Sequence, residues 1–138
     1  MGQFKIIDTT ADLGIECSGE NINDLFNTAL LGLYYSLFEK HINFEKLHKL
    51  KICKEDLKND ELTFLLYDLL DDALFYVYSK NILFNIDKLS TSEQFIIKNL
   101  YENRYKIKNE IKAITMHNLN CSWDNNKNLW IAKVILDI

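Results

Sequence analysis

The chain has 138 residues, 48% hydrophobic and 26% charged, a composition typical of a compact folded domain and not of a disordered or fibrous protein. A chain of this length buries roughly two-thirds of the surface that its unfolded form exposes, so its core needs no metal or disulfide. Sixteen Lys and Arg against twenty Asp and Glu give a formal charge of -4, which argues against autonomous nucleic-acid binding.

Membrane association and covalent or zinc cross-links are not expected. No apolar run reaches the roughly 20 residues of a membrane span, and the first residues match neither a signal peptide nor a myristoylation motif. We therefore expect a cytosolic, cytoplasmic protein. Cys17, Cys53 and Cys121 are far apart and form no C-x-x-C pair, so we expect small buried apolar residues there. Without proline or a Gly/Ser-rich linker, residues 1–138 are predicted to form a single domain.

The first half of the chain contains three strand-like segments. Residues 3–7 and 13–18 are short and apolar-rich, and the polar residues 8–12 between them predict a loop. Residues 48–54 alternate in polarity, which is typical of a strand with one face in water.

Two amphipathic helices are predicted from apolar residues at helical spacing. Asn21 with Asp24 three residues later forms a capping pair for a helix that extends to about Glu39. Asn59 is expected to cap the second helix, which should end near Tyr78. Its buried side should be Leu62, Leu65, Leu66, Leu69, Leu70, Ala73 and Val77.

The remaining strand-like segments are residues 82–88, 94–100, 114–123 and 129–137. The Asn- and Asp-rich residues 124–128 predict a hairpin between the last two. The last strand is apolar at both parities, which predicts a central strand covered on both faces, whereas residues 101–111 receive no assignment. We therefore predict an α+β two-layer sandwich, in which two amphipathic helices pack on one face of a mixed, mostly antiparallel sheet.

The end of the chain concentrates negative charge, because Asp137 immediately precedes the terminal carboxylate of Ile138. In an ordered central strand these two anions would repel each other, and a cation or a basic partner would remove that cost. The alternative is a frayed polar terminus without a function.

The loop at residues 8–12 offers two carboxylates, from Asp8 and Asp12, and two hydroxyls, from Thr9 and Thr10. Oxygen ligands of this kind suit hard cations such as Ca²⁺ and Mg²⁺, and less exclusively Mn²⁺. The alternative is an ordinary turn that is stabilised by the Asp side chains.

Several segments together resemble the archease family, and the resemblance covers nearly the whole chain. They are Thr10-Ala11-Asp12-Leu13-Gly14-Ile15, Asp24-Leu25-Phe26-Asn27-Thr28-Ala29, Lys112-Ala113-Ile114-Thr115-Met116-His117, Trp130-Ile131-Ala132 and Leu136-Asp137-Ile138. The resemblance implies a divalent-metal site formed by Asp12, Asp137 and the terminal carboxylate of Ile138. Ca²⁺ is the expected ion in isolation, with Mn²⁺ or Mg²⁺ as alternatives.

The resemblance also implies a function. Archeases are accessory proteins of the GTP-dependent tRNA-splicing ligase, which joins RNA ends that carry a 3′-phosphate or a 2′,3′-cyclic phosphate. They promote guanylylation of the ligase and its multiple turnover. The alternative is a chaperone or interaction module for tRNA-modifying methyltransferases, with the metal structural or absent. We do not expect an enzyme, because the chain has no nucleophile elbow, phosphate-binding Gly loop or H-E-x-x-H motif.

Three further residues are weighed as support for the metal site or as partner contacts. The family usually has His where this chain has Thr9, and we interpret that position as one that shapes the loop through a hydrogen bond. Strand parity places His117 on a mostly apolar face, which favours a hydrogen-bonded structural residue over a role behind the metal carboxylates. Lys112 is either a contact for an anionic partner or a solvated lysine at a strand edge.

The second predicted helix carries Asp68, Asp71 and Asp72 at i, i+3 and i+4. The default interpretation is a solvated acidic face. The functional alternative is a docking surface for a basic partner, with nearby aromatic residues as anchors. Those aromatic residues are Tyr67, Phe75, Tyr76 and Tyr78.

Overall fold

The computed structural model describes residues 2–8 and 12–138 and has an α+β fold, as the sequence predicts. Within the described residues the elements are, in chain order, β1 (Gln3–Asp8), β2 (Asp12–Gly19), α1 (Ile22–Phe38), the short 3-10 helix η1 (Phe44–Lys46), β3 (Lys49–Asp56), α2 (Leu62–Lys80), β4 (Ile82–Ser90), β5 (Phe95–Glu102), β6 (Ala113–Asp124) and β7 (Leu129–Asp137). None of the described helices is both long and apolar enough to cross a lipid bilayer.

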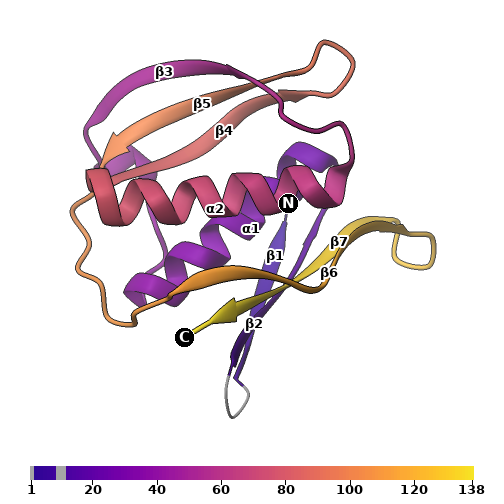
Figure 1. Ribbon diagram of the computed structural model, residues 1–138, viewed down its shortest axis with the longest axis horizontal. Helices are drawn as coiled ribbons and strands as arrows, with labels where there is room; N and C mark the ends of the chain where they lie inside the picture. The colour runs from indigo at the N-terminus through magenta and orange to yellow at the C-terminus, as the bar shows by residue number, and fades with distance from the viewer. Residues whose placement is uncertain (1, 9–11) are drawn as a thin grey trace.

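The strands form two antiparallel sheets, where the sequence analysis expected one mixed sheet. One sheet has the order β1-β2-β7-β6 and the other the order β3-β5-β4. Both helices lie between the two sheets and contact each of them (Figure 1). The reason lies in α1, which buries eleven of its 17 residues and therefore needs cover on more than one side.

A cluster of buried side chains joins both helices to both sheets. The Tyr34 hydroxyl of α1 contributes a polar link within it. It donates to the Phe84 carbonyl (2.8 Å) and accepts from the Phe84 N–H (3.0 Å) on β4. Burial raises the pKa of the Tyr34 hydroxyl, so that hydroxyl stays protonated and both hydrogen bonds persist.

The predicted start of α1 is confirmed and that of α2 is wrong. The Asn21 side chain accepts the Asp24 N–H at 2.8 Å, as an N-cap residue does. The N-cap of α2 is Glu61, which makes no side-chain capping bond. Asn59 instead donates its side-chain amide to Asp68 (2.9 Å). α2 also extends two residues beyond Tyr78, to Lys80.

The hairpin between β6 and β7 is confirmed, and β7 is central between β2 and β6. The prediction that β7 is covered on both faces is wrong. Val134 and Leu136 are fully buried toward the helices, whereas Lys133 on the opposite face is exposed. Ile131 and Ile135 are half-buried on that open face, so the apolar run does not mark a second covering layer.

The three cysteines are free thiols that differ in burial. Cys17 is buried as expected, whereas Cys53 and Cys121 are half-buried. Burial raises the pKa of Cys17 to about 12 and that of Cys121 to about 11. Both groups therefore remain thiols at neutral pH and are poor nucleophiles.

Candidate functional site

The first residue of β2 and the last residue of β7 lie directly opposite each other. In the antiparallel ladder of these strands Asp12 is the partner of Asp137, and Leu13 is the partner of Leu136. Directly opposite residues have Cβ atoms about 4.5–5.5 Å apart. The fold therefore brings together the two acidic segments that the sequence analysis linked. Figure 1 shows the C-terminus just beyond the end of β7.

Both aspartates lie on the outer face of their sheet. Alternate residues of β2 and β7, among them Ile15 and Leu136, are buried toward the helices. Asp12 and Asp137 have the opposite parity, which points their side chains away from the helices. Asp137 is exposed, Asp12 is half-buried, and Ile138 is 44% exposed. The carboxylates are therefore accessible to an ion or to a partner protein.

The C-terminal strand is held on both sides, so the alternative of a frayed terminus is wrong. Asp137 pairs with Asp12 on one side and with Ala113 on the other. In addition, the Lys112 N–H donates to the Asp137 carbonyl at 2.7 Å. Lys112 thus contributes a backbone contact, which fixes the position of Asp137. We call Asp12, Asp137 and the terminal carboxylate of Ile138 the carboxylate rim.

The donor set of the carboxylate rim fits a hard divalent cation. It consists only of carboxylate oxygens, which Ca²⁺, Mg²⁺ and Mn²⁺ accept. Like charges directly opposite each other in a sheet are destabilising, and a shared cation offsets that repulsion. Within residues 2–8 and 12–138 no group of three or more His, Cys, Asp and Glu side chains is placed to hold a metal. The two aspartates would therefore need further oxygen ligands, and the terminal carboxylate of Ile138 is the one that the family resemblance implies. Thr9 and Thr10 lie outside the described residues.

His117 does not join the carboxylate rim. It lies in an irregular part of β6, between Thr115 and Asn120, where the register with β7 shifts. Thr115 is the partner of Ile135, two residues before Asp137, and His117 lies further away along the strand. The parity argument fails here because the irregularity breaks the alternation. His117 is exposed and is not a residue of an apolar face.

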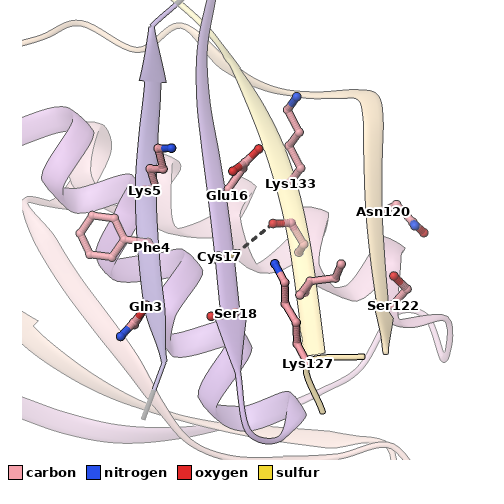
Figure 2. Close-up of a pocket in the computed structure, with 12 residues that line it drawn as sticks. Gln3, Phe4, Lys5, Glu16, Cys17, Ser18, Asn120, Ser122, Lys127 and Lys133 are labelled. Atoms are coloured by element: carbon pink, nitrogen blue, oxygen red, sulfur yellow. Dashed lines mark hydrogen bonds between the residues drawn. The ribbon is translucent and has the colours of Figure 1, made fainter. Parts of the chain in front are cut away.

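A hollow of about 440 Å³ lies further along the same outer face of the sheet (Figure 2). Lys5, Glu16 and Lys133 form a row across it, because Glu16 is the partner of Lys5 on β1 and of Lys133 on β7. One carboxylate between two ammonium groups is a common stabilising arrangement in sheets. These three residues are most of the charged side chains that line the hollow, and their arrangement is favourable without a bound ligand.

Lys98 on β5 is a buried charge that the sequence analysis missed. It is 2% exposed, and its Nζ lies 2.7 Å from a Glu55 oxygen and 3.4 Å from an Asp72 oxygen. The same Nζ lies 4.6 Å from the centre of the Phe84 ring. These contacts make Lys98 a structural residue. They also form an ion pair with Asp72, although the helical spacing alone places Asp72 on a solvated face.

The exposed side of α2 carries more aromatic surface than the sequence analysis identified. Phe75 and Tyr78 are exposed, whereas Tyr67 and Tyr76 are half-buried. Phe64, which the sequence analysis did not consider, is also exposed. Its spacing of four residues from Asp68 was the signal that could have placed it on the acidic side of the helix.

Comparison with known proteins confirms the resemblance noted in the sequence. The model of the Archease protein family (MTH1598/TM1083) matches residues 4–138. Two similar proteins are named protein archease, one from Sulfurisphaera tokodaii (27% identical over 146 residues) and one from Methanothermobacter thermautotrophicus (27% over 150). Each alignment covers 100% of this chain and 100% of the relative.

Two solved structures share the fold. The solution structure of protein 1598 of Methanobacterium thermoautotrophicum has a TM-score of 0.76, 22% identity, and 98% coverage of both chains. The crystal structure of an archease from Thermotoga maritima, named a possible chaperone, has a TM-score of 0.69 and 22% identity. The alignment covers 97% of this chain and 96% of the Thermotoga chain. At these identities the likeness concerns the fold.

Proposed function

This chain belongs to the archease family, and from that premise we propose that it is an accessory protein of a GTP-dependent tRNA-splicing RNA ligase. The ligase would join RNA ends that carry a 3′-phosphate or a 2′,3′-cyclic phosphate. The accessory protein would promote guanylylation of the ligase and its repeated turnover. The family and the name of the Thermotoga relative support an auxiliary role.

The observation that carries the proposal is the direct pairing of Asp12 with Asp137 beside the C-terminus. A divalent cation held by Asp12, Asp137 and the carboxylate of Ile138 would supply positive charge next to the phosphates of GTP. The carboxylates of this chain would hold the ion, and the backbone hydrogen bond from the Lys112 N–H keeps Asp137 in place.

The carboxylate rim is placed where a partner protein can reach it. It lies where the two central strands β2 and β7 meet end to start, on the face that the helices leave open, and Asp137 and Ile138 are exposed. The pairing of β7 with β2 and β6 holds this strand end in place, and its exposed residues can be reached by a partner protein. The ligase would supply the reacting histidine and the nucleotide site, because the role proposed for this chain is auxiliary.

A multiple-turnover ligation assay tests the proposal. Purified ligase from the same organism is supplied with GTP, Mn²⁺ or Mg²⁺ and an RNA with a 3′-phosphate end, and turnovers are counted with and without this protein. We expect wild-type protein to increase the number of turnovers and Asp137→Asn to abolish that increase. A short tag after Ile138 should have the same effect, because it removes the terminal carboxylate from its position.

Asp87→Asn is the matched control, since Asp87 is an exposed aspartate on β4, in the other sheet. Full stimulation by the tagged protein and by Asp137→Asn would refute the role of the carboxylate rim.

A second candidate is a chaperone or interaction module for tRNA-modifying methyltransferases. The name of the Thermotoga relative, a possible chaperone, favours the chaperone role and names no client. In that case the client protein would stay soluble in the presence of this chain. Asp137→Asn and the C-terminal tag would then leave the effect unchanged. The same two variants therefore distinguish the two candidates.

A further inference from the structure

Helix α2 presents one uncovered side to solvent. Figure 1 shows α2 crossing the front of the view, between the two sheets. Five residues of α2 recur at alternating spacings of four and three, and they therefore lie on one face of the helix. These residues, which we call the α2 stripe, are Phe64, Asp68, Asp71, Phe75 and Tyr78. The α2 stripe extends along the helix for about 21 Å.

The aromatic residues of the α2 stripe are unusually exposed for side chains of their size. Phe64 is 42% exposed, Phe75 is 57% exposed and Tyr78 is 47% exposed. A single exposed aromatic residue is ordinary. Phe75 and Tyr78 lie one turn apart, whereas Phe64 lies about three turns before Phe75, so the α2 stripe offers separate aromatic side chains and not one continuous apolar patch. Aromatic residues are enriched among interface anchors.

Between the aromatic residues the α2 stripe is acidic. Asp71 is exposed, and Asp68 lies one turn before it. Burial and the neighbouring carboxylates of Asp72 and Asp68 raise the pKa of Asp71, and Lys58 opposes them. The carboxylates thus repel one another, and a basic surface laid against them would relieve that repulsion.

The C-terminal end of the α2 stripe leads to the carboxylate rim. The Tyr78 hydroxyl accepts the Ile111 N–H at 3.0 Å. The next residue, Lys112, donates its N–H to the Asp137 carbonyl at 2.7 Å. Two hydrogen bonds and one peptide unit therefore connect the exposed aromatic surface to the acidic end of β7. This path ends at the backbone carbonyl of Asp137, whose side chain faces away from the helices.

We propose that the α2 stripe is the surface by which this protein docks on its RNA ligase, against a basic face of that enzyme. The proposal rests on the function proposed above. A ligase that holds RNA must carry Lys and Arg along its RNA channel, because phosphate binding requires them. Phe64, Phe75 and Tyr78 would provide the apolar anchors and Asp71 the complementary charge.

The test is a titration of the purified ligase with this protein by isothermal calorimetry, at low and at high salt. We expect the double variant Phe64→Ser, Phe75→Ser to bind about tenfold more weakly or worse, as loss of two anchors predicts. Asp71→Asn should reduce the salt dependence of binding, because it removes one of the screened charges. Ile52→Ser is the matched control, since Ile52 is 60% exposed on β3.

Melting curves establish that each variant is folded, and Asp71→Lys replaces the double variant if the latter melts early. A double variant or Asp71→Lys protein that binds as tightly as wild type overturns the proposal. The proposal is also overturned if the stripe variants bind the ligase normally but convert a dimer of this chain to monomers in sedimentation experiments. The α2 stripe would then be a contact between two copies of this chain.

Docking and stimulation are separable in the same samples. We expect Asp137→Asn to bind the ligase normally and to lose stimulation. A wild-type protein that binds through the α2 stripe but never stimulates ligation would refute the proposed function and leave the docking surface intact. If the stripe variants bind the ligase with wild-type affinity and still stimulate ligation, the docking surface is refuted and the proposed function stays intact.

Discussion

Asp12 and Asp137 are direct partners across β2 and β7, although they come from opposite ends of the chain. The pairing places two carboxylates and the chain terminus at the ends of the two central strands of one sheet. Both side chains face away from the helices, so they are available to solvent.

Divalent metal should stabilise the protein through the carboxylate rim. We expect Ca²⁺ or Mn²⁺ to raise the melting temperature, because a ligand bound only by the folded state adds about 2.7 kcal/mol at 100 times its Kd. Asp12→Asn should remove most of this rise, whereas Asp87→Asn should retain it. Differential scanning calorimetry with and without chelator measures the effect. Equal rises in wild type and Asp12→Asn would show that the ion binds elsewhere.

Removing the partner of Lys98 should cost more than removing Lys98 itself. Glu55→Ala leaves a buried ammonium group with only the longer contact to Asp72, and we expect a loss on the order of 3 kcal/mol in unfolding free energy. Lys98→Met keeps the volume and removes the buried charge, so its loss should be clearly smaller. Urea denaturation compares the two, with Glu110→Ala as an exposed control. The reverse order would contradict this account of the Lys98 contacts.

The Tyr34 hydroxyl should contribute measurably to stability. Tyr34→Phe leaves the buried N–H and carbonyl of Phe84 without their partner, which costs about 1–3 kcal/mol. Tyr35→Phe is the matched control on the same helix, because Tyr35 is only half-buried and makes ring contacts with Phe4 and His41. Thermal unfolding of both variants is the measurement. A Tyr34→Phe protein as stable as Tyr35→Phe would contradict the prediction.

Asp71 should make the protein less stable as its carboxyl ionises. The folded state raises the pKa of Asp71, so the folded protein binds more protons than the unfolded chain between the ordinary aspartate pKa of 3.8 and the raised value. The contribution of this group to stability is therefore largest below the unfolded pKa and is lost as pH rises through the folded pKa. Asp71→Asn should melt higher than wild type at pH 7.

The difference between Asp71→Asn and wild type should shrink as pH falls below the unfolded pKa, where the carboxyl is protonated in both states. Melting curves of the two proteins over the acidic range test this sign. Because Asp71 is exposed, the effect should be small and should weaken further in salt. A wild-type protein more stable than Asp71→Asn at pH 7 would contradict it.

Local sequence patterns were sufficient for most of the secondary structure. Apolar residues at helical spacing predicted both helices, the Asn21 cap marked the start of α1, and residues 124–128 predicted the hairpin between β6 and β7. These features depend on neighbours in the chain, so the sequence carries them directly. The predicted α2 cap was wrong: the helix begins after Glu61, and the Asn59 side chain donates to Asp68 in the second turn of the helix.

The residues themselves pointed to the C-terminal carboxylates and to the loop that contains Asp12, and a family resemblance joined them into one site. Only the ladder between β2 and β7 shows that Asp12 and Asp137 share a face and a register. The division into two sheets, the burial of Lys98 and the exposure of His117 at an irregular point of β6 were likewise beyond the sequence. Periodicity indicates which side of a helix or strand is apolar, but it does not indicate which other element covers that side. The covering element is determined by contacts between distant segments, which form only when the whole chain packs.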